Sequence, residues 1–231
     1  MLTLENIDQY YGSSHTLKNL SLSITPGACT VIMGRNGVGK TTLMQCITGL
    51  LPLRNGSMKL ADRDITKIAA EGRAAVGIGY VPQGRQIFPL LSVEENLRTG
   101  LRARSDGSKV IPELVYELFP VLKEMLRRRG GDLSGGQQQQ LAIGRALVTE
   151  PELLLLDEPT EGIQPNVVHD IGTIITRLNK EIGLTVVLVE QKLPFARRVG
   201  DDFVLMDRGE VVAKGAMDTL SEDLVKQYLT V

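Results

Sequence analysis

The sequence has little cysteine, and this scarcity limits what can hold the fold together. Only Cys29 and Cys46 occur among its 231 residues, and both stand in apolar surroundings. A small disulfide-bonded scaffold needs several paired cysteines, so we expect no disulfide framework and a reducing compartment. We interpret both cysteines as small core residues.

An excess of charge of either sign is also missing. The chain carries 26 basic and 27 acidic residues. Because these charges nearly cancel, the chain has no general attraction to DNA, RNA or an acidic membrane. We therefore expect a mixed surface and no nucleic-acid partner.

Long apolar runs are absent as well. No uncharged apolar stretch approaches the ~18 residues that a membrane-spanning helix needs. The first residues lack the basic start and apolar stretch of a signal peptide. The longest apolar runs, 153–156 and 185–189, have the length of buried strands. Any role at a membrane would therefore have to be exercised through partner proteins.

Short strands and helices alternate along the chain. Alternating or continuous apolar residues predict strands at 2–7, 20–24, 29–33, 57–60, 79–82, 153–156, 185–189, 203–206 and 211–214. A helical period predicts helices at 41–50, within 92–126, and at 137–150, 167–182 and 218–228. Asn55-Gly56 and Arg208-Gly209 predict hairpin turns, and residues 102–109 predict a polar loop. The pattern indicates an α/β core with a β-rich beginning and a helical insertion near 85–145, which suggests a nucleotide-binding fold.

A glycine-rich motif follows the predicted strand 29–33. Residues 34–41 match G-x-x-x-x-G-K-[ST] between a strand and a helix, which is the context that this phosphate loop requires. Its glycines permit a backbone path whose amides converge on phosphate oxygens, and the next helix adds its positive end. We predict that Lys40 lies between the β- and γ-phosphates and that Thr41 ligates Mg²⁺. The predicted nucleotide-binding residues here are Gly34, Arg35, Asn36, Gly37, Val38, Gly39, Lys40, Thr41 and Thr42.

Two carboxylates end the apolar run 153–156. Asp157 is suited to help bind Mg²⁺, and Glu158 can polarise a water for in-line attack on the γ-phosphate. An isolated Asp-Glu pair is often only a surface helix cap, but the phosphate loop favours the catalytic interpretation. A GTPase would need Asn-Lys-x-Asp, and the nearest match, 179–182, ends in isoleucine. Nothing identifies the acceptor site of a small-molecule kinase.

A second motif, Leu-Ser-Gly-Gly-Gln at 133–137, precedes the acidic pair by about twenty residues. With it the chain resembles the ABC ATPases over its whole length. The resemblance implies an α/β fold with a P-loop NTPase (RecA-like) core, an N-terminal antiparallel β subdomain and an inserted α-helical subdomain. It implies one ABC ATPase domain over 1–231, with 1–84 and 146–231 forming the core and 85–145 the helical subdomain.

The same resemblance implies a shared active site. In such proteins the signature contacts ATP held on the phosphate loop of a second subunit, so Ser134, Gly135, Gly136 and Gln137 are predicted to bind nucleotide in a head-to-tail dimer. Tyr11 matches the aromatic residue that stacks on adenine. Gln83 matches the glutamine that reaches Mg²⁺ and senses the membrane subunits, and a groove beside the helical subdomain receives those subunits.

Two departures from the usual family pattern stand out. Gln191 occupies the place of a histidine that contacts the γ-phosphate, and glutamine carries no titratable proton. Glu158 is then the predicted base, with Gln191 as a second catalytic residue; His15 and His169 are expected at the surface. Gln164 replaces an aspartate in the segment after Glu158.

These departures resemble the branched-chain amino-acid branch of bacterial importers. Residues 9–15, 34–39, 130–140 and 161–165 are most similar to the second ATPase subunit of urea importers. The resemblance implies an ATPase that uses ATP and Mg²⁺ at the cytoplasmic face of the inner membrane. Its implied partners are permease subunits, a second ATPase subunit in a heterodimer or homodimer and, indirectly, a substrate-binding protein. A branched-chain amino-acid importer is the first alternative, and a soluble ABC ATPase without a transport role is the second.

Overall fold

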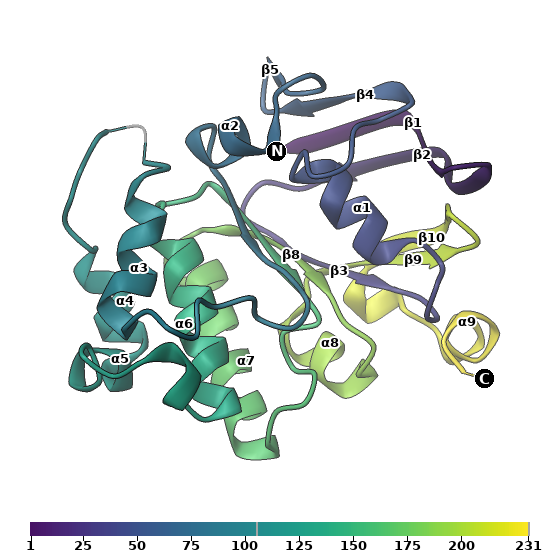
Figure 1. Ribbon diagram of the computed structural model, residues 1–231. Coiled ribbons are helices and arrows are strands. Elements are labelled where there is room, and N and C mark those ends of the chain that lie inside the picture. Colours follow the sequence, from purple (N-terminus) through teal and green to yellow (C-terminus); the bar gives the residue numbers. More distant parts are fainter. Residues whose placement is uncertain (105, 231) are drawn as a thin grey trace.

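Ten strands form two sheets in the part of the chain that the computed structural model describes, residues 1–104 and 106–230 (Figure 1). The smaller sheet is antiparallel, with the order β2-β1-β4-β5. Its strands are β1 (Leu2–Tyr11), β2 (Ser14–Ile24), β4 (Asn55–Leu60) and β5 (Arg63–Asp64). The predicted β-rich beginning is confirmed.

The larger sheet has the order β10-β9-β3-β8-β7-β6. Its strands are β3 (Cys29–Met33), β6 (Ile78–Val81), β7 (Leu153–Asp157), β8 (Thr185–Val189), β9 (Asp202–Asp207) and β10 (Glu210–Ala216). All neighbouring pairs are parallel except β9 with β10, which form an antiparallel edge hairpin. Strands β3, β7 and β8 are buried along their whole length, as continuous apolar runs predict for the centre of a parallel sheet.

Helices cover both faces of the larger sheet. Helix α1 (Lys40–Ile47) lies between the two sheets, and one core cluster joins it to both of them (Figure 1). The other core cluster packs α6 (Gly135–Leu147), α7 (Pro165–Lys180) and α8 (Leu193–Val199) against the opposite side. The remaining elements are α2 (Ala70–Ala75), α3 (Val93–Leu101), α4 (Glu113–Leu118), α5 (Pro120–Glu124), α9 (Glu222–Tyr228) and the short turns η1 (Gly130–Asp132) and η2 (Met217–Thr219). Cys29 and Cys46 are buried and unpaired, as expected.

The predicted hairpin turn at Asn55-Gly56 is wrong. Both residues belong to β4, and the hairpin turn lies later, between β4 and β5. Gly56 has φ +91° beside a register shift between β1 and β4, where an added Cβ would lie 2.6 Å from the carbonyl oxygens of Glu5 and Asn6. The Asn-Gly pair therefore marks a β-bulge with close backbone approach, for which glycine is required just as it is in a tight turn.

Several predicted boundaries also move. The helical period within 92–126 is divided among α3, α4 and α5, because Pro112 caps α4 and Pro120 begins α5. The final helix begins at Glu222 rather than 218, since the Ser221 hydroxyl accepts a hydrogen bond from the Leu224 amide. The predicted loop 102–109 contains Ser105, which lies outside the described residues.

Candidate functional site

The phosphate-loop motif leaves the carboxyl end of β3 and enters α1. Gly34, Gly37 and Gly39 have φ of +153°, +80° and +107°, a region that other residues avoid. An added Cβ at Gly34 would lie 2.4 Å from the carbonyl oxygen of Met206 on β9. The glycines therefore serve both the backbone path and the close contact between the loop and β9.

Lys40 is the first residue of α1 and is only 5% exposed. Its Nζ donates hydrogen bonds to the carbonyl oxygens of Gly34 and Arg35, at 2.7 and 2.8 Å. Burial lowers the pKa of Lys40, and the charges of Glu158 and Asp157 oppose that shift. The Lys40 side chain thus folds back over the phosphate loop and bonds to its carbonyl oxygens.

Parallel strands bring the other predicted residues to the same edge of the sheet. Because β3, β6, β7 and β8 run in the same direction, the segments that follow them meet beside the phosphate loop. They form a pocket of about 340 Å³. The predicted residues that line it are Asn36, Gly37, Gly39, Lys40, Thr41, Thr42, Gln83, Glu158 and Gln191, and Thr16 and Glu161 are additional.

Three predicted phosphate-loop residues have other surroundings. Val38 is 7% exposed and packs in the core cluster around α1. The Arg35 guanidinium donates a hydrogen bond to the Thr230 carbonyl near the end of the chain. Gly34 contacts β9 as described above. These three shape the loop without lining the pocket.

Asp157 ends β7 and is 1% exposed. Within the described residues, neither carboxylate oxygen has a well-aligned hydrogen-bond partner, although the Thr41 and Tyr80 hydroxyls lie beside the carboxylate. Burial raises the pKa of Asp157 to about 6, and Glu158 adds to the rise while Thr41 and Lys40 oppose it. Two unpartnered oxygens beside the Thr41 hydroxyl fit a hard cation such as Mg²⁺, which prefers oxygen ligands.

Glu158 stands in a constrained backbone position directly after β7. Its φ is +50°, unusual for a residue with a side chain, and its amide donates to the Val189 carbonyl at the end of β8, at 3.0 Å. Its carboxylate accepts a hydrogen bond from Gln191 Nε2, and Gln83 Nε2 lies 3.4 Å away. The fold therefore brings together the predicted base, Gln191 and Gln83.

Sequence reasoning missed a buried carboxylate beside this group. Glu190 is 3% exposed; its Oε1 accepts the amides of Gln191 and Lys192, at 2.8 and 3.0 Å. Its Oε2 accepts the Thr160 hydroxyl at 2.7 Å. Glu190 thereby ties the loop after β8 to the loop after β7. The sequence signal was a charged residue directly after a buried strand.

Glu161 was also missed as a pocket residue. Its Oε2 accepts a hydrogen bond from Gln83 Nε2 at 2.9 Å. Gln83 thus contacts two carboxylates on one loop. Nothing in the sequence pattern distinguished Glu161 from an ordinary surface residue, because this contact depends on how the loops after β6 and β7 face each other.

Tyr11 does not line the pocket. It is 48% exposed, and its hydroxyl lies 3.2 Å from Gln45 Oε1 on α1. Its neighbour Tyr10 stacks on His15 at 4.1 Å between ring centroids. His15 is half-buried and contacts Asp8 at 2.8 Å, whereas His169 is exposed.

The signature motif is separated from the pocket. Ser134 caps α6, accepting the Gln137 amide at 3.3 Å, while Gln137 Oε1 accepts the Ser134 amide at 3.0 Å. None of Ser134, Gly135, Gly136 and Gln137 lines the pocket. A single chain does not bring its own signature and phosphate loop together.

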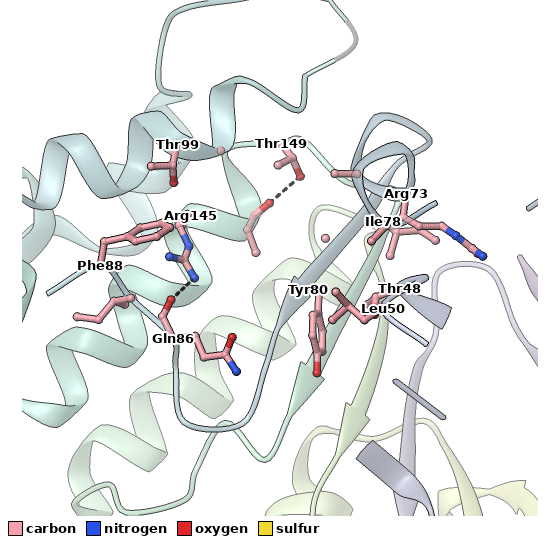
Figure 2. Close-up of a pocket in the computed structure, with 16 residues that line it drawn as sticks. Thr48, Leu50, Arg73, Ile78, Tyr80, Gln86, Phe88, Thr99, Arg145 and Thr149 are labelled. Atoms are coloured by element: carbon pink, nitrogen blue, oxygen red, sulfur yellow. Dashed lines mark hydrogen bonds between the residues drawn. The ribbon is translucent and has the colours of Figure 1, made fainter. Parts of the chain in front are cut away.

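A second hollow of about 680 Å³ lies on another part of the molecule (Figure 2). Its walls come from the end of α1, from α2, β6, α3 and α6, and from the segment of Gln86 and Phe88. Arg145 donates to the Gln86 carbonyl at 2.8 Å and lies 5.2 Å from the Phe88 ring centre. We call this hollow the α3–α6 groove.

Comparison with known proteins identifies the family. Residues 17–161 match the family described as "ABC transporter". The branched-chain amino acid transport ATP-binding protein BraG of Pseudomonas aeruginosa is 38% identical over 213 residues, which cover 92% of this chain and 91% of that protein. A probable branched-chain amino acid transport ATP-binding protein, LivF of Archaeoglobus fulgidus, is 33% identical over 96% of this chain and 94% of its own length.

Solved structures agree in fold. A nucleotide-free ATP-binding cassette from an ABC transporter has a TM-score of 0.82 at 30% identity, covering 100% of this chain and 95% of that one. A dimeric cassette in a post-hydrolysis state, bound to ADP and Pi, also has a TM-score of 0.82, at 27% identity, and the match covers 94% and 99% of the two chains. The predicted fold class is confirmed. With its phosphate loop, acidic pair and signature, the chain belongs to the ABC transporter family and is an ABC ATPase.

Proposed function

We propose that this chain powers an importer by hydrolysing ATP in a dimer of ATPase subunits. The observation that carries the proposal is the pocket at the carboxyl edge of the larger sheet. There Lys40, Thr41 and Glu158 converge beside the unpartnered Asp157, while the signature of the same chain lies elsewhere. A second subunit would supply the missing signature.

The phosphate loop is suited to hold the triphosphate. Its amides and the Lys40 ammonium would neutralise the β- and γ-phosphates, and Tyr11 would stack on adenine. Thr41, Asp157 and Gln83 would hold Mg²⁺, which when bound supplies positive charge against the phosphate oxygens. The two unpartnered oxygens of Asp157 support this assignment.

Glu158 is proposed as the general base. It would accept a proton from water as the water oxygen attacks the γ-phosphorus and the bond to ADP breaks. Gln191 would orient the Glu158 carboxylate, which it already contacts. Ser134, Gly135, Gly136 and Gln137 of the second subunit would close the site over the γ-phosphate, with the N-terminal end of α6 directed at the anion.

The α3–α6 groove is the proposed docking site for permease subunits. None of the helices within residues 1–104 and 106–230 is long and apolar enough to cross a membrane. The groove exposes Leu50 and Phe88, at 57% and 47%, beside the partly buried cation of Arg145. We place the assembly at the cytoplasmic face of the inner membrane, with a substrate-binding protein reached through the permease. The division into 1–84 with 146–231 and 85–145 puts this groove between the two proposed parts.

For the substrate, we propose a branched-chain amino acid. The names of BraG and LivF support this choice, and none of the relatives described above is named for urea. The urea assignment expected from the sequence therefore becomes the second candidate. It rests on the motifs at 9–15, 34–39, 130–140 and 161–165.

Affinity purification from membranes followed by uptake assays tests the proposal. The tagged chain is expected to bring with it permease subunits and a second ATPase. A strain lacking this chain is expected to lose uptake of radiolabelled leucine and to regain it with the wild-type chain but not with Glu158→Gln. Loss of labelled urea uptake with leucine uptake intact would select the second candidate, and copurification of nucleic acid without permease would reject transport.

A further inference from the structure

Three consecutive residues of the segment after Gln83 adopt left-handed backbone conformations. Gly84, Arg85 and Gln86 have φ of +76°, +68° and +46°. For arginine and glutamine this conformation costs about 1 kcal/mol or more each, and it persists only where surrounding contacts impose it. Contacts of the Arg85 side chain hold the segment, together with the hydrogen bond that Arg145 donates to the Gln86 carbonyl.

The Arg85 guanidinium binds two other segments of the chain. Nη1 donates to Gln138 Oε1 on α6 at 3.2 Å, and Nη2 donates to the Gly162 carbonyl at 3.3 Å. Gly135 lies directly against it, since an added Cβ there would be 3.1 Å from Nη1. A planar guanidinium can satisfy both acceptors at once, which a lysine ammonium cannot do in the same geometry.

Gln138 connects Arg85 to the backbone of the signature, because its side chain bonds to both. Its Nε2 lies within 3.3 Å of the Leu133 carbonyl and 3.4 Å of the Gly130 carbonyl. On the other side, Gly162 follows Glu161, which accepts the hydrogen bond from Gln83. A continuous series of contacts therefore connects Gln83 to the signature. It passes through Glu161, Gly162, Arg85 and Gln138.

We propose that Arg85 is a positioning residue that fixes the signature relative to the nucleotide pocket of its own chain. The inference rests on the proposed dimer, in which that signature completes the partner's site. Gln83 lines the chain's own pocket, so a nucleotide bound there would move the Arg85 segment and with it the signature surface offered to the partner. Arg85 would thus connect the two ATP sites of the dimer.

A double-mutant cycle on the assembled transporter tests the proposal. Arg85→Ala is expected to lower kcat for ATP hydrolysis by about 10-fold or more, since small misplacement of a catalytic group has effects of that size. Gln138→Ala is expected to cause a similar loss, and the double variant no more than either single one, because both break the same connection. Multiplicative losses in the double variant would overturn the proposal.

Binding of a fluorescent ATP analogue to the isolated chain separates positioning from damage to the pocket. Its affinity is expected to stay within about 2-fold of wild type in Arg85→Ala, because the Arg85 guanidinium bonds to Gln138 and Gly162 and does not line the pocket of the phosphate loop. Arg85→Lys is expected to recover less than half of the lost kcat. Lysine provides the charge but not the planar guanidinium that bonds to Gln138 and Gly162 at once. Full recovery by lysine, or a large loss of affinity, would overturn the proposal.

Hydrogen exchange supplies a readout that general destabilisation would not reproduce. In Arg85→Ala, amides of residues 133–138 are expected to exchange faster while those of 34–43 are unchanged. Uniformly faster exchange, or no change at 133–138, would contradict the proposal. Arg98→Ala serves as the control, since Arg98 makes an exposed ion pair with Glu94 on α3. If wild-type transporter shows no ATP hydrolysis, the proposed function fails; if it hydrolyses ATP and Arg85→Ala behaves as wild type, only this inference fails.

Discussion

At the scale of single residues, the end of β7 combines two neighbouring carboxylates with different surroundings. Asp157 is enclosed, with its oxygens unpartnered, whereas the Glu158 carboxylate faces the pocket and contacts glutamine side chains. Adjacent residues at a strand end point in different directions, so the fold can give one the role of ligand and the other the role of base. This difference leads to separate predictions for the two positions.

Replacing Glu158 by glutamine is expected to keep ATP binding and to lower turnover by about 100-fold or more, because the amide cannot accept the proton of the attacking water. Gln191→Ala is expected to keep much more activity, since it removes only a contact to the base. Phosphate release under saturating ATP and binding of a fluorescent ATP analogue measure the two effects. Equal losses of turnover in the two variants would contradict this ranking.

The buried Asp157 carboxylate predicts a pH-dependent stability. Burial raises its pKa from 3.8 to about 6, so the folded chain holds this proton more tightly than the unfolded chain does. The protonated Asp157 carboxyl therefore contributes to the stability of the folded chain. This contribution is fully present below about pH 4 and is lost as the pH rises through about 6. Asp157→Asn avoids the loss, and at pH 8 the nucleotide-free variant is expected to be more stable than wild type by up to about 3 kcal/mol.

Urea unfolding in the presence of a chelator, at pH 8 and near pH 4.5, measures this advantage for Asp157→Asn. The advantage is expected to shrink at the lower pH, where the wild-type carboxyl is largely protonated. Asp170→Asn, which changes an exposed carboxylate on α7, is the control and is expected to alter stability by less than about 0.5 kcal/mol. An advantage of equal size at both pH values would rule out the buried carboxylate as its cause.

At the scale of elements, a buried asparagine organises the turn that leads into α3. Asn96 is fully buried; its Oδ1 accepts the Phe88 amide at 2.8 Å. Its Nδ2 shares its two hydrogens among the carbonyls of Phe88, Leu91 and Ser92, which lie at 2.9 to 3.1 Å. One side chain thus contacts four backbone groups of the segment that forms a rim of the α3–α6 groove.

Asn96→Ala is expected to destabilise the chain by about 3 kcal/mol, because it leaves buried amide and carbonyl groups without partners. Denaturant unfolding followed by circular dichroism measures the change. Asn166→Ala, at an exposed position on α7, is expected to change stability by less than about 0.5 kcal/mol. A loss at Asn96 as small as that at Asn166 would show that the turn holds without the side chain.

At the scale of the whole molecule, the proposed catalytic pocket and the proposed docking groove occupy separate surfaces. The nucleotide pocket lies where β3, β6, β7 and β8 end, and the α3–α6 groove lies between β6 and the helices that follow it. The segment after β6 reaches both, since Gln83 lines the pocket and Gln86 and Phe88 line the groove. A partner that docks at the groove could therefore shift Gln83 in the pocket, because only a few backbone residues separate the two.

A charge in the groove is expected to separate docking from nucleotide binding. Leu50→Asp should reduce copurification of the permease by about 10-fold or more, since an unpaired carboxylate would be desolvated at the interface. Binding of a fluorescent ATP analogue by the isolated chain should not change. Val110→Asp is the matched control, because Val110 is an exposed apolar residue, at 73%, outside the groove. Equal copurification of the two variants would place the permease elsewhere.

The amino-acid sequence by itself was enough to identify the family and to predict many of the strands and the main motifs. Strands β3 and β8 begin and end where their apolar runs do, and the phosphate loop, acidic pair and signature each follow from a local pattern of residues. These features depend on neighbours in sequence: burial on both faces gives continuous apolar strands, and a helix N-terminus needs its capping residues nearby. Asn55-Gly56 shows the limit, since a bulge and a turn favour the same glycine.

Only the tertiary structure decided which distant side chains meet. Glu190 with Thr160, Glu161 with Gln83, and Arg85 with Gln138 are separated by 30, 78 and 53 residues. Their contacts depend on strand order and on the paths of the loops after β6, β7 and β8, which no local pattern encodes. The separation of the signature from the pocket of its own chain is decided in the same way, because it is set by the packing of α6 against the sheet.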